Sequence, residues 1–199
     1  MAELSALDPD LGAIADRHGL PPTRLRPEGF ETLFKIVVQQ QVSLASGAAI
    51  WRRLEDGLDG ANAGAVQAAT AEDLRAMGLS RQKARYAHAL AEAVLDGALD
   101  LAGLDKLDDE AAIAQLTQVT GIGRWTAEIY LLSVLQRPDV WPAADVALMV
   151  AAGEVKGLAT RPDAKALGRL AEPWRPWRAI AARLLWHYYR FARGRDAGL

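Results

Sequence analysis

Residues 116–145 read LTQVTGIGRWTAEIYLLSVLQRPDVWPAAD, and this stretch limits the fold and the chemistry of the chain more than any other. Gly121 and Gly123 enclose one apolar residue and lead into a helical segment that begins at Arg124. Glycines adopt backbone conformations that other residues avoid, so amides in such a turn can point together toward an anion. The positive end of the following helix adds to this attraction. The pattern predicts either a purely structural helix–turn–helix or a phosphate-binding hairpin.

The residues that follow the glycines favour phosphate binding. Thr126 can donate its hydroxyl from the first helical turn, and Arg124 adds a positive charge. Trp125 places a large aromatic ring in the same turn. A phosphate group is therefore the expected guest of this turn.

Apolar spacing predicts helices along the whole chain of 199 residues. Ala, Leu and Arg dominate and β-branched runs are few, which favours helix. Phe30, Leu33 and Val37 recur at helical spacing in a segment expected to end near Gln41. No alternating strand pattern, repeat or low-complexity tract is visible. We expect an all-α, two-lobed helical bundle with residues 1–199 in a single domain. Expected helix N-caps are Ser43, Thr70 (with Asp73), Ser80, Asp109, Asp145 and Asp163.

Composition excludes several classes of chemistry. The chain has no cysteine, which rules out disulfides, thiol nucleophiles and Cys-ligated metals. The three histidines, His18, His88 and His187, lack metal-binding spacing, and neither G-x-S-x-G nor a Walker loop occurs. No signal-like segment or membrane-spanning apolar run is visible. We expect a cytoplasmic, soluble protein without a membrane partner.

Charge is distributed unevenly. The net charge of −2 argues mildly against a nucleic-acid partner. However, the stretch from Pro173 to Arg195 contains six arginines and no acidic residue. Singly, each arginine is typical of a solvated helix face; as a group they could line a phosphate-binding cleft. They are Arg175, Arg178, Arg183, Arg190, Arg193 and Arg195.

Asp145 follows the rigid segment Trp141–Ala144 and precedes an apolar segment. One interpretation is a plain helix N-cap, and the other is a carboxylate fixed to stabilise a developing positive charge. The two are compatible, because an N-cap both orients the carboxylate and favours its negative charge. Tryptophans and tyrosines crowd the second half of the chain and would either fill the core or wall a cavity for a planar cationic guest, such as an alkylated purine.

Four segments, taken in order and spacing, carry a family resemblance over nearly the whole chain. They are FETLFKIVVQQQVSLASGAAI, GLSRQKARY, LTQVTGIGRWTAEIYLL with RPDVWPAAD, and EPWRPWRAIAARLLWHYY. The chain resembles the helix–hairpin–helix DNA glycosylases, specifically the compact form of the DNA-3-methyladenine glycosylase II branch. The resemblance implies an active site in a cleft between lobes of about 30–108 and 109–199, with residues 1–29 packed on the second lobe.

The resemblance also implies roles for individual residues. Asp145 matches the essential aspartate that positions or activates water and stabilises the cationic sugar. Trp125 and Trp186 match aromatics of the base pocket, and Gln41 matches the wedge that fills the gap left by a flipped nucleotide. The hairpin groups that match DNA contacts are Gly121, Gly123, Arg124 and Thr126. Backbone carbonyls at Thr117, Val119 and Ile122 match a site for Na⁺ or K⁺.

The chain departs from the family pattern at several positions. Thr120 replaces a proline common before the glycines, and Gln41 is polar where some relatives have an apolar wedge. Ile129 stands where some relatives have a pocket tyrosine. Bifunctional relatives carry a lysine nucleophile at the position of Trp125, so strand cleavage is not expected.

The resemblance therefore implies a monofunctional enzyme that flips and hydrolytically excises alkylated purines, of the 3-methyladenine and 7-methylguanine type, from double-stranded DNA to start base excision repair. The protein is expected to be a nucleoid-associated monomer that requires no cofactor. Two alternatives stay open: a non-catalytic lesion-binding protein, and a glycosylase for deaminated bases.

Overall fold

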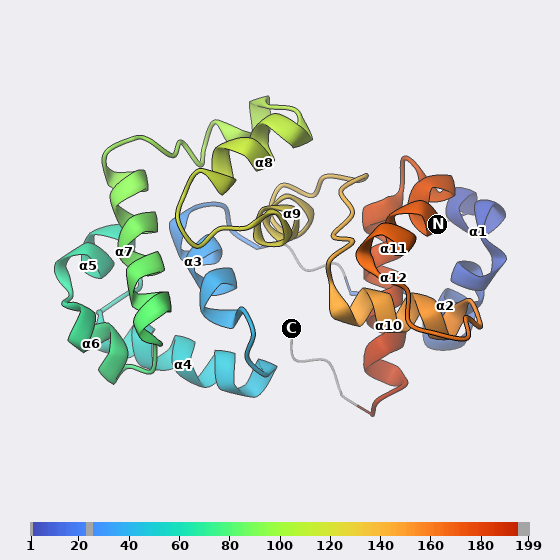
Figure 1. Cartoon of the computed structure of the whole chain (residues 1–199), viewed down its shortest axis with the longest axis horizontal. Coiled ribbons are helices and arrows are strands. Elements are labelled where there is room, and N and C mark those ends of the chain that lie inside the picture. The colour runs from blue at the N-terminus through green and yellow to red at the C-terminus, as the bar shows by residue number, and fades with distance from the viewer. Residues whose placement is uncertain (1, 23–25, 195–199) are drawn as a thin grey trace. The chain divides into compact units, whose positions relative to one another are not determined.

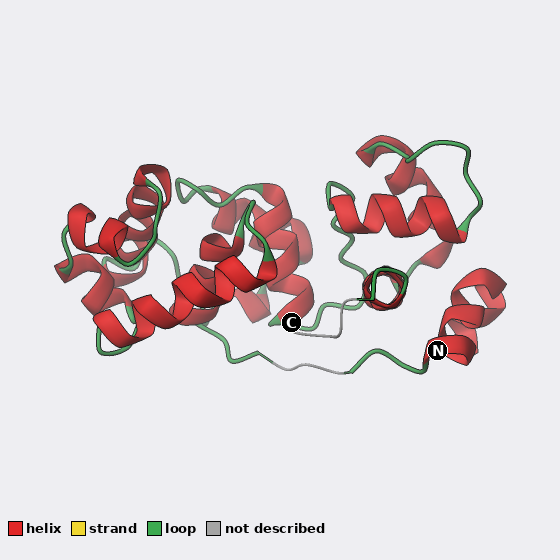
Figure 2. Cartoon of the chain, turned by 90° about the horizontal axis from the view of Figure 1, so that it is seen from below, coloured by secondary structure: helices red, strands yellow, loops and turns green. Residues whose placement is uncertain are grey.

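The computed structural model describes residues 2–22 and 26–194. Within these ranges the chain consists of helices and loops, with no strand (Figure 2). The expected all-α fold is therefore confirmed. None of the helices in these ranges is both long enough and apolar enough to span a bilayer.

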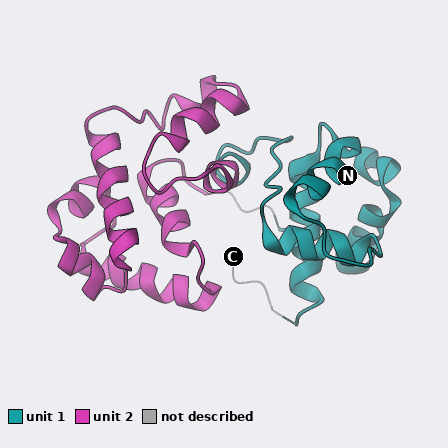
Figure 3. Ribbon diagram, viewed as in Figure 1, with its two compact units in different colours: residues 1–25, 131–199 teal, residues 26–130 magenta. Residues whose placement is uncertain are grey.

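The chain divides into two compact units, one formed by residues 26–130 and the other by residues 1–25 together with 131–199 (Figure 3). The division therefore falls near residue 130, later than the boundary near residue 108 expected from the sequence. The reason is that the hairpin turn packs on helices of the 26–130 unit, as described below.

The 26–130 unit is built around two helices, α3 and α7 (Figure 1). Helix α3 packs on α4 and α7, and α7 also packs on α5 and α6. Leu33, Phe34, Leu54 and Leu90 are fully buried between them. The helices of this unit are α3 (Phe30–Gln39), α4 (Leu44–Gly57), α5 (Ala63–Ala68), α6 (Ala71–Ala76), α7 (Arg81–Leu95), η1 (Leu104–Lys106), α8 (Asp109–Thr117) and the start of α9 (Arg124–Ser133).

The other unit is centred on the last helix, α12 (Arg178–Phe191), which packs on α10 and on α2. The N-terminal helices therefore lie against α12 and η2, and Trp174 is fully buried in this unit. Its remaining helices are α1 (Ala2–Leu7), α2 (Pro9–His18), α10 (Val146–Val155), α11 (Ala164–Ala171) and η2 (Glu172–Trp174).

Side-chain caps begin most of the helices, as the sequence predicts. Thr70 and Asp73 form a complete capping box at the start of α6. One expected cap is wrong: Asp108, not Asp109, caps α8, and its Oδ1 accepts a hydrogen bond from the Ala111 amide at 2.8 Å. An N-cap side chain reaches the amide two or three residues ahead, and two adjacent aspartates satisfy that pattern almost equally well.

A buried charge cluster ties the N-terminal helices to the rest of their unit. Asp8 caps α2 and is almost fully buried. Lys156 Nζ donates to Asp8 Oδ1 at 2.5 Å and to Asp10 Oδ2 at 2.7 Å. Trp174 Nε1 donates to Asp8 Oδ2 at 2.6 Å. Burial raises the pKa of Asp8, but the hydrogen bonds from Lys156 and Trp174 outweigh it, so the net pKa lies below the usual value.

We expect Asp8→Asn to lower the free energy of unfolding by about 1 to 3 kcal/mol at pH 7, because it removes a charge-assisted hydrogen bond to buried partners. A carboxylate whose folded-state pKa is lowered stabilises the fold above its unfolded pKa, near 4, and this contribution is lost as the pH falls through the folded-state pKa. The difference between wild type and variant should therefore shrink below about pH 4.

Urea unfolding at several pH values measures this difference. Asp16→Asn, at an exposed position of α2, is the matched control and should match the wild type at every pH. A difference for Asp8→Asn that does not change with pH would contradict the expectation.

Candidate functional site

The hairpin turn between α8 and α9 is closed by a hydrogen bond from the Ile122 amide to the Val119 carbonyl at 3.0 Å. Gly121 has a φ of +98°, in the region that favours glycine. A Cβ at Gly121 would lie only 2.2 Å from Cγ of Tyr86, so the ring also leaves no space for a side chain. Gly123 is exposed, and a Cβ there would meet nothing within 4 Å. The turn therefore requires glycine at position 121 for two independent reasons.

Thr126 lies behind this turn and not on its surface. Its side chain is 2% exposed. Gln40 Nε2 donates to Thr126 Oγ1 at 2.8 Å and to the Gly121 carbonyl at 3.2 Å. In this structure Thr126 supports the turn from inside, and its expected contact with a phosphate stays a prediction. An anion at the turn would instead meet the first-turn amides of α9, which have no acceptor within the helix.

Arg124 is held by two carboxylates. Its Nη atoms form a bidentate pair with Glu110 at 2.6 and 2.9 Å, and its Nε donates to Glu128 at 2.9 Å. Hydrogen bonding to Arg124 lowers the pKa of Glu110, although burial acts in the opposite direction. The positive charge expected beside the turn is therefore already compensated, and a DNA phosphate would have to compete with the exposed Glu110 for Arg124.

The loop after α3 carries the expected wedge residue. Gln41 is exposed and has a φ of +54°, which is uncommon for a residue with a side chain. Beside it, Val42 and Leu44 are 38% and 43% exposed. Ser43 then begins α4 by accepting a hydrogen bond from the Ser46 amide. The loop thus presents a polar side chain followed by two exposed apolar ones, which the sequence did not indicate.

Asp145 lies in the other unit, at the N-terminus of α10. Its Oδ1 accepts hydrogen bonds from the Leu148 amide at 2.9 Å and from Trp186 Nε1 at 3.1 Å. The expected N-cap is confirmed. The indole donor comes from α12, 41 residues later in the chain. The amide and the indole together fix the orientation of a half-buried carboxylate at the positive end of a helix.

The two expected pocket tryptophans belong to different units. Trp186 is half-buried and bonded to Asp145, whereas Trp125 is half-buried in the first turn of α9. Ile129 is half-buried one turn further along α9. The structure thus places Asp145 and Trp186 together, and it joins the hairpin to Gln40, the residue before Gln41.

Four of the six C-terminal arginines bind acceptors within their own unit. Arg175 and Arg178 both pair with Asp139. Arg193 pairs with Glu154 and covers the ring of Tyr189, and Arg183 donates to the Leu132 carbonyl. Arg195 lies outside the described residues. Each of these four arginines therefore has a structural role within its unit, and the expected phosphate-binding cleft stays a prediction.

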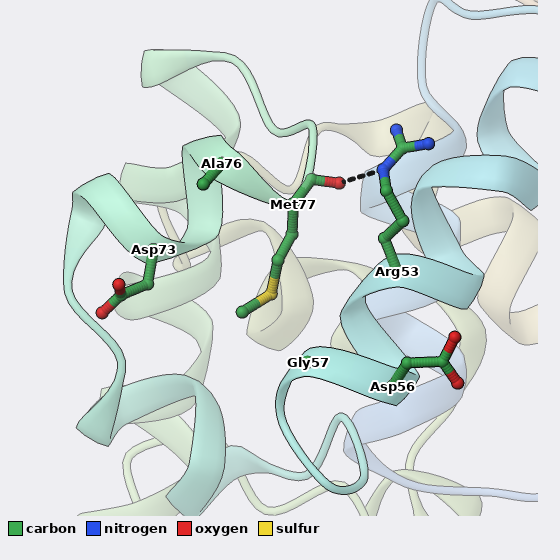
Figure 4. Close-up of a pocket in the computed structure, with 6 residues that line it drawn as sticks. All are labelled: Arg53, Asp56, Gly57, Asp73, Ala76 and Met77. Atoms are coloured by element: carbon green, nitrogen blue, oxygen red, sulfur yellow. Dashed lines mark hydrogen bonds between the residues drawn. The ribbon is translucent and has the colours of Figure 1, made fainter.

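An open hollow of about 440 Å³ lies between α4 and α6 (Figure 4). Of its charged groups, Arg53 donates from Nε to the Met77 carbonyl at 2.8 Å, Asp73 belongs to the capping box of α6, and Asp56 also lines the hollow. None of the site residues expected from the sequence lines it. The part of the chain that the structure describes also contains no cluster of three or more His, Cys, Asp or Glu side chains able to hold a metal ion.

Comparison with known proteins identifies the family. Residues 34–176, which include both the hairpin and Asp145, match the model of the HhH-GPD superfamily of base excision DNA repair proteins. The chain belongs to this superfamily.

Individual relatives of this HhH-GPD protein match along most of their length. The alkylbase DNA glycosidase-like protein mag2 of Schizosaccharomyces pombe is 27% identical over 96% of the chain and 92% of its own length. The 3-methyladenine DNA glycosylase Mag1 of the same yeast, solved with abasic DNA, superposes with a TM-score of 0.86 at 25% identity, covering 100% of this chain and 98% of Mag1. A DNA-3-methyladenine glycosidase from Bacillus halodurans gives a TM-score of 0.80 at 31% identity, covering 96% and 89%.

The sequence of this HhH-GPD protein did not indicate which residues support the hairpin from behind. Gln40 and Tyr86 contact the hairpin, and Lys83 binds the end of α3. The helical period could have found Gln40, because it follows Leu33 and Val37 on the buried face of α3. No sequence signal distinguishes Tyr86 or Lys83 from ordinary residues of α7, since their partners lie more than thirty residues away.

Proposed function

We propose that this protein is a monofunctional DNA glycosylase, which flips alkylated purines of the 3-methyladenine and 7-methylguanine type out of double-stranded DNA and hydrolyses their glycosidic bond. The observation that carries the proposal is the Asp145 carboxylate, oriented by the Leu148 amide and the Trp186 indole in a chain of the base excision superfamily.

The chemistry requires little from the protein beyond one fixed carboxylate. Alkylation at N3 or N7 makes the purine cationic, so it leaves with the electron pair of the glycosidic bond as a neutral base. Positive charge then develops on the sugar, where the Asp145 carboxylate stabilises it electrostatically. Water adds to C1′ and releases one proton, leaving an abasic site. Trp125 cannot form a Schiff base, so no strand cleavage follows.

The remaining roles belong to groups in both units. The amides at Gly123 and Arg124 would hold a backbone phosphate at the positive end of α9. Gln41, flanked by Val42 and Leu44, would fill the space of the flipped nucleotide. Trp125 would contact the base through its ring, and Trp186 would do the same while its N–H remains on Asp145.

The hairpin carbonyls of Thr117, Val119 and Ile122 would hold a monovalent cation next to the bound phosphate. Carbonyl oxygens are ligands that Na⁺ and K⁺ accept. The Val119 carbonyl already accepts one hydrogen bond, from the Ile122 amide, and a carbonyl oxygen has a second lone pair. The donor set therefore fits such an ion, whose contribution would be to bridge the turn and the phosphate.

Measuring the bases released from modified duplexes tests the proposal. Duplexes carrying 3-methyladenine, 7-methylguanine, ethenoadenine or hypoxanthine are incubated with the protein, and free base and strand breaks are measured separately. Release of the methylated purines without strand breaks is expected. Lesion binding without release would favour the non-catalytic alternative, and release of hypoxanthine alone would favour the deaminated-base alternative.

Trp186→Phe tests the indole donor, because it keeps an aromatic ring and removes the N–H. We expect the single-turnover rate of base release to fall about tenfold, the equivalent of one hydrogen bond to a charged group, with DNA affinity nearly unchanged. Trp177→Phe is the matched control, since its indole donates to the Glu3 carboxylate at 2.8 Å in the same unit. Equal rates for the two variants would contradict the assigned role.

A further inference from the structure

We infer that Gln40 is a positioning residue, which couples the loop of Gln41 to the hairpin turn. The coupling would hold the loop that enters the duplex at a fixed distance from the phosphate that the turn binds. The inference rests on the proposed function and adds a residue to its machinery. The Gln40 side chain joins two segments that lie about 80 residues apart in the sequence, both within the 26–130 unit.

Gln40 is at the junction of α3 and the exposed loop. Its backbone amide still donates to the Val37 carbonyl, as in the last turn of a helix, and the next residue already has a positive φ. Its side-chain amide leaves the loop and reaches two groups of the hairpin, the Gly121 carbonyl and the Thr126 hydroxyl. One bond therefore holds the turn itself, and the other holds the first turn of α9.

Helix α7 supports this junction from below. Lys83 Nζ donates to the carbonyls of Val38 at 2.7 Å and of Gln40 at 2.6 Å. Carbonyls at the end of a helix have no N–H donor within the helix, and Lys83 supplies one. Tyr86, one turn later on α7, lies against Gly121. The end of α3 and the hairpin turn thus rest on the same face of one helix, and Gln40 joins them directly.

This arrangement has a consequence for the proposed reaction. The turn would hold the DNA backbone, while the loop of Gln41 would enter the duplex. A rigid connection between them places the loop at a fixed distance from the bound phosphate. Without Gln40 the turn would still be formed by Gly121 and Tyr86, but the loop would lose its direct bonds to it. Loss of Gln40 should therefore impair recognition of a gap in the duplex more than binding of intact DNA.

Equilibrium binding of two duplexes tests this inference without any catalytic step. One duplex is undamaged, and the other carries a single tetrahydrofuran abasic site, which cannot be excised. We expect the wild type to prefer the abasic duplex and Gln40→Leu to lose about tenfold of that preference, as for two neutral hydrogen bonds, while its affinity for undamaged DNA stays within about twofold. Gln67→Ala, at an exposed position of α5, should retain the full preference.

Variants of the acceptor distinguish positioning from general stability. Thr126→Val removes the acceptor and should lose part of the preference, whereas Thr126→Ser keeps the hydroxyl and should restore it. If Gln40 and Thr126 act through one bond, the double variant Gln40→Leu/Thr126→Val should lose less than the sum of the two single losses. Thermal unfolding of each variant accompanies the binding measurements.

Three results would overturn the inference: a wild type without preference for the abasic duplex, retention of the full preference in Gln40→Leu, and equal losses for Thr126→Val and Thr126→Ser. Failure of the proposed glycosylase activity is recognised separately, by the absence of base release from methylated duplexes.

Discussion

Replacing Asp145 with Asn should lower the release of methylated purines by at least about a hundredfold, while DNA binding stays close to that of the wild type. The substitution removes the negative charge that would stabilise the cationic sugar. It keeps a side-chain oxygen that can accept from the Leu148 amide and the Trp186 indole, so α10 keeps its cap. Single-turnover release of 7-methylguanine, together with binding to an abasic duplex, measures both effects.

The matched control is Asp163→Asn, which makes the same change at the N-cap of α11. Asp163 accepts a hydrogen bond from the Ala166 amide at 2.7 Å and is exposed. Any general effect of neutralising a helix cap in this unit should appear in both variants. Full activity of Asp145→Asn would remove the basis of the proposed mechanism.

Gly121→Ala should be the most destabilising single change in the hairpin. The new methyl group would meet the ring of Tyr86 and would also be forced into a positive φ. Overpacking contributes about 1 to 3 kcal/mol and the strain of a positive φ about 1 to 2 kcal/mol, so we expect a loss of about 2 to 5 kcal/mol in the free energy of unfolding. Because the turn must shift, affinity for DNA should fall as well.

Two further variants separate these causes. Gly123→Ala, two residues away, adds a methyl group in open space and should change the free energy of unfolding little. In a Tyr86→Ala background the clash is absent, and Gly121→Ala should then cost only the strain of a positive φ, about 1 to 2 kcal/mol. Equal losses for Gly121→Ala and Gly123→Ala in the wild-type background would show that Tyr86 does not restrict the turn.

The sequence predicted the helices well because their signals are local. Apolar spacing identified α3, and capping side chains identified the starts of α4, α6, α7, α10 and α11. These signals depend on residues within one or two turns of each other. The sequence predicted Asp109 as the N-cap of α8, whereas the structure has Asp108 there. The prediction was wrong because two adjacent aspartates differ only in backbone conformation, which the sequence does not reveal.

The candidate site was predicted less completely, because the role of a charged or polar side chain depends on its distant partners. Arg124 and Thr126 both looked available to a phosphate in the sequence. In the structure Arg124 donates to Glu110 and Glu128. The Thr126 hydroxyl is buried and accepts a hydrogen bond from Gln40. From the sequence, the C-terminal arginines could line a phosphate-binding cleft. In the structure, Asp139 and Glu172 form ion pairs with Arg175, and Glu154 forms one with Arg193.

Local patterns of residues already predict that the chain is all-helical, that it turns at a glycine pair between two helices, and that an aspartate begins the helix after Trp141 and Pro142. Helix propensity, capping and the freedom of glycine are properties of short segments, so the residues alone express them. Three contacts become visible only in the folded chain: Tyr86 leaves no space for a side chain at position 121, Trp186 donates to Asp145, and Gln40 joins the loop to the hairpin. These contacts join residues between 35 and 86 positions apart, and packing in three dimensions brings them together.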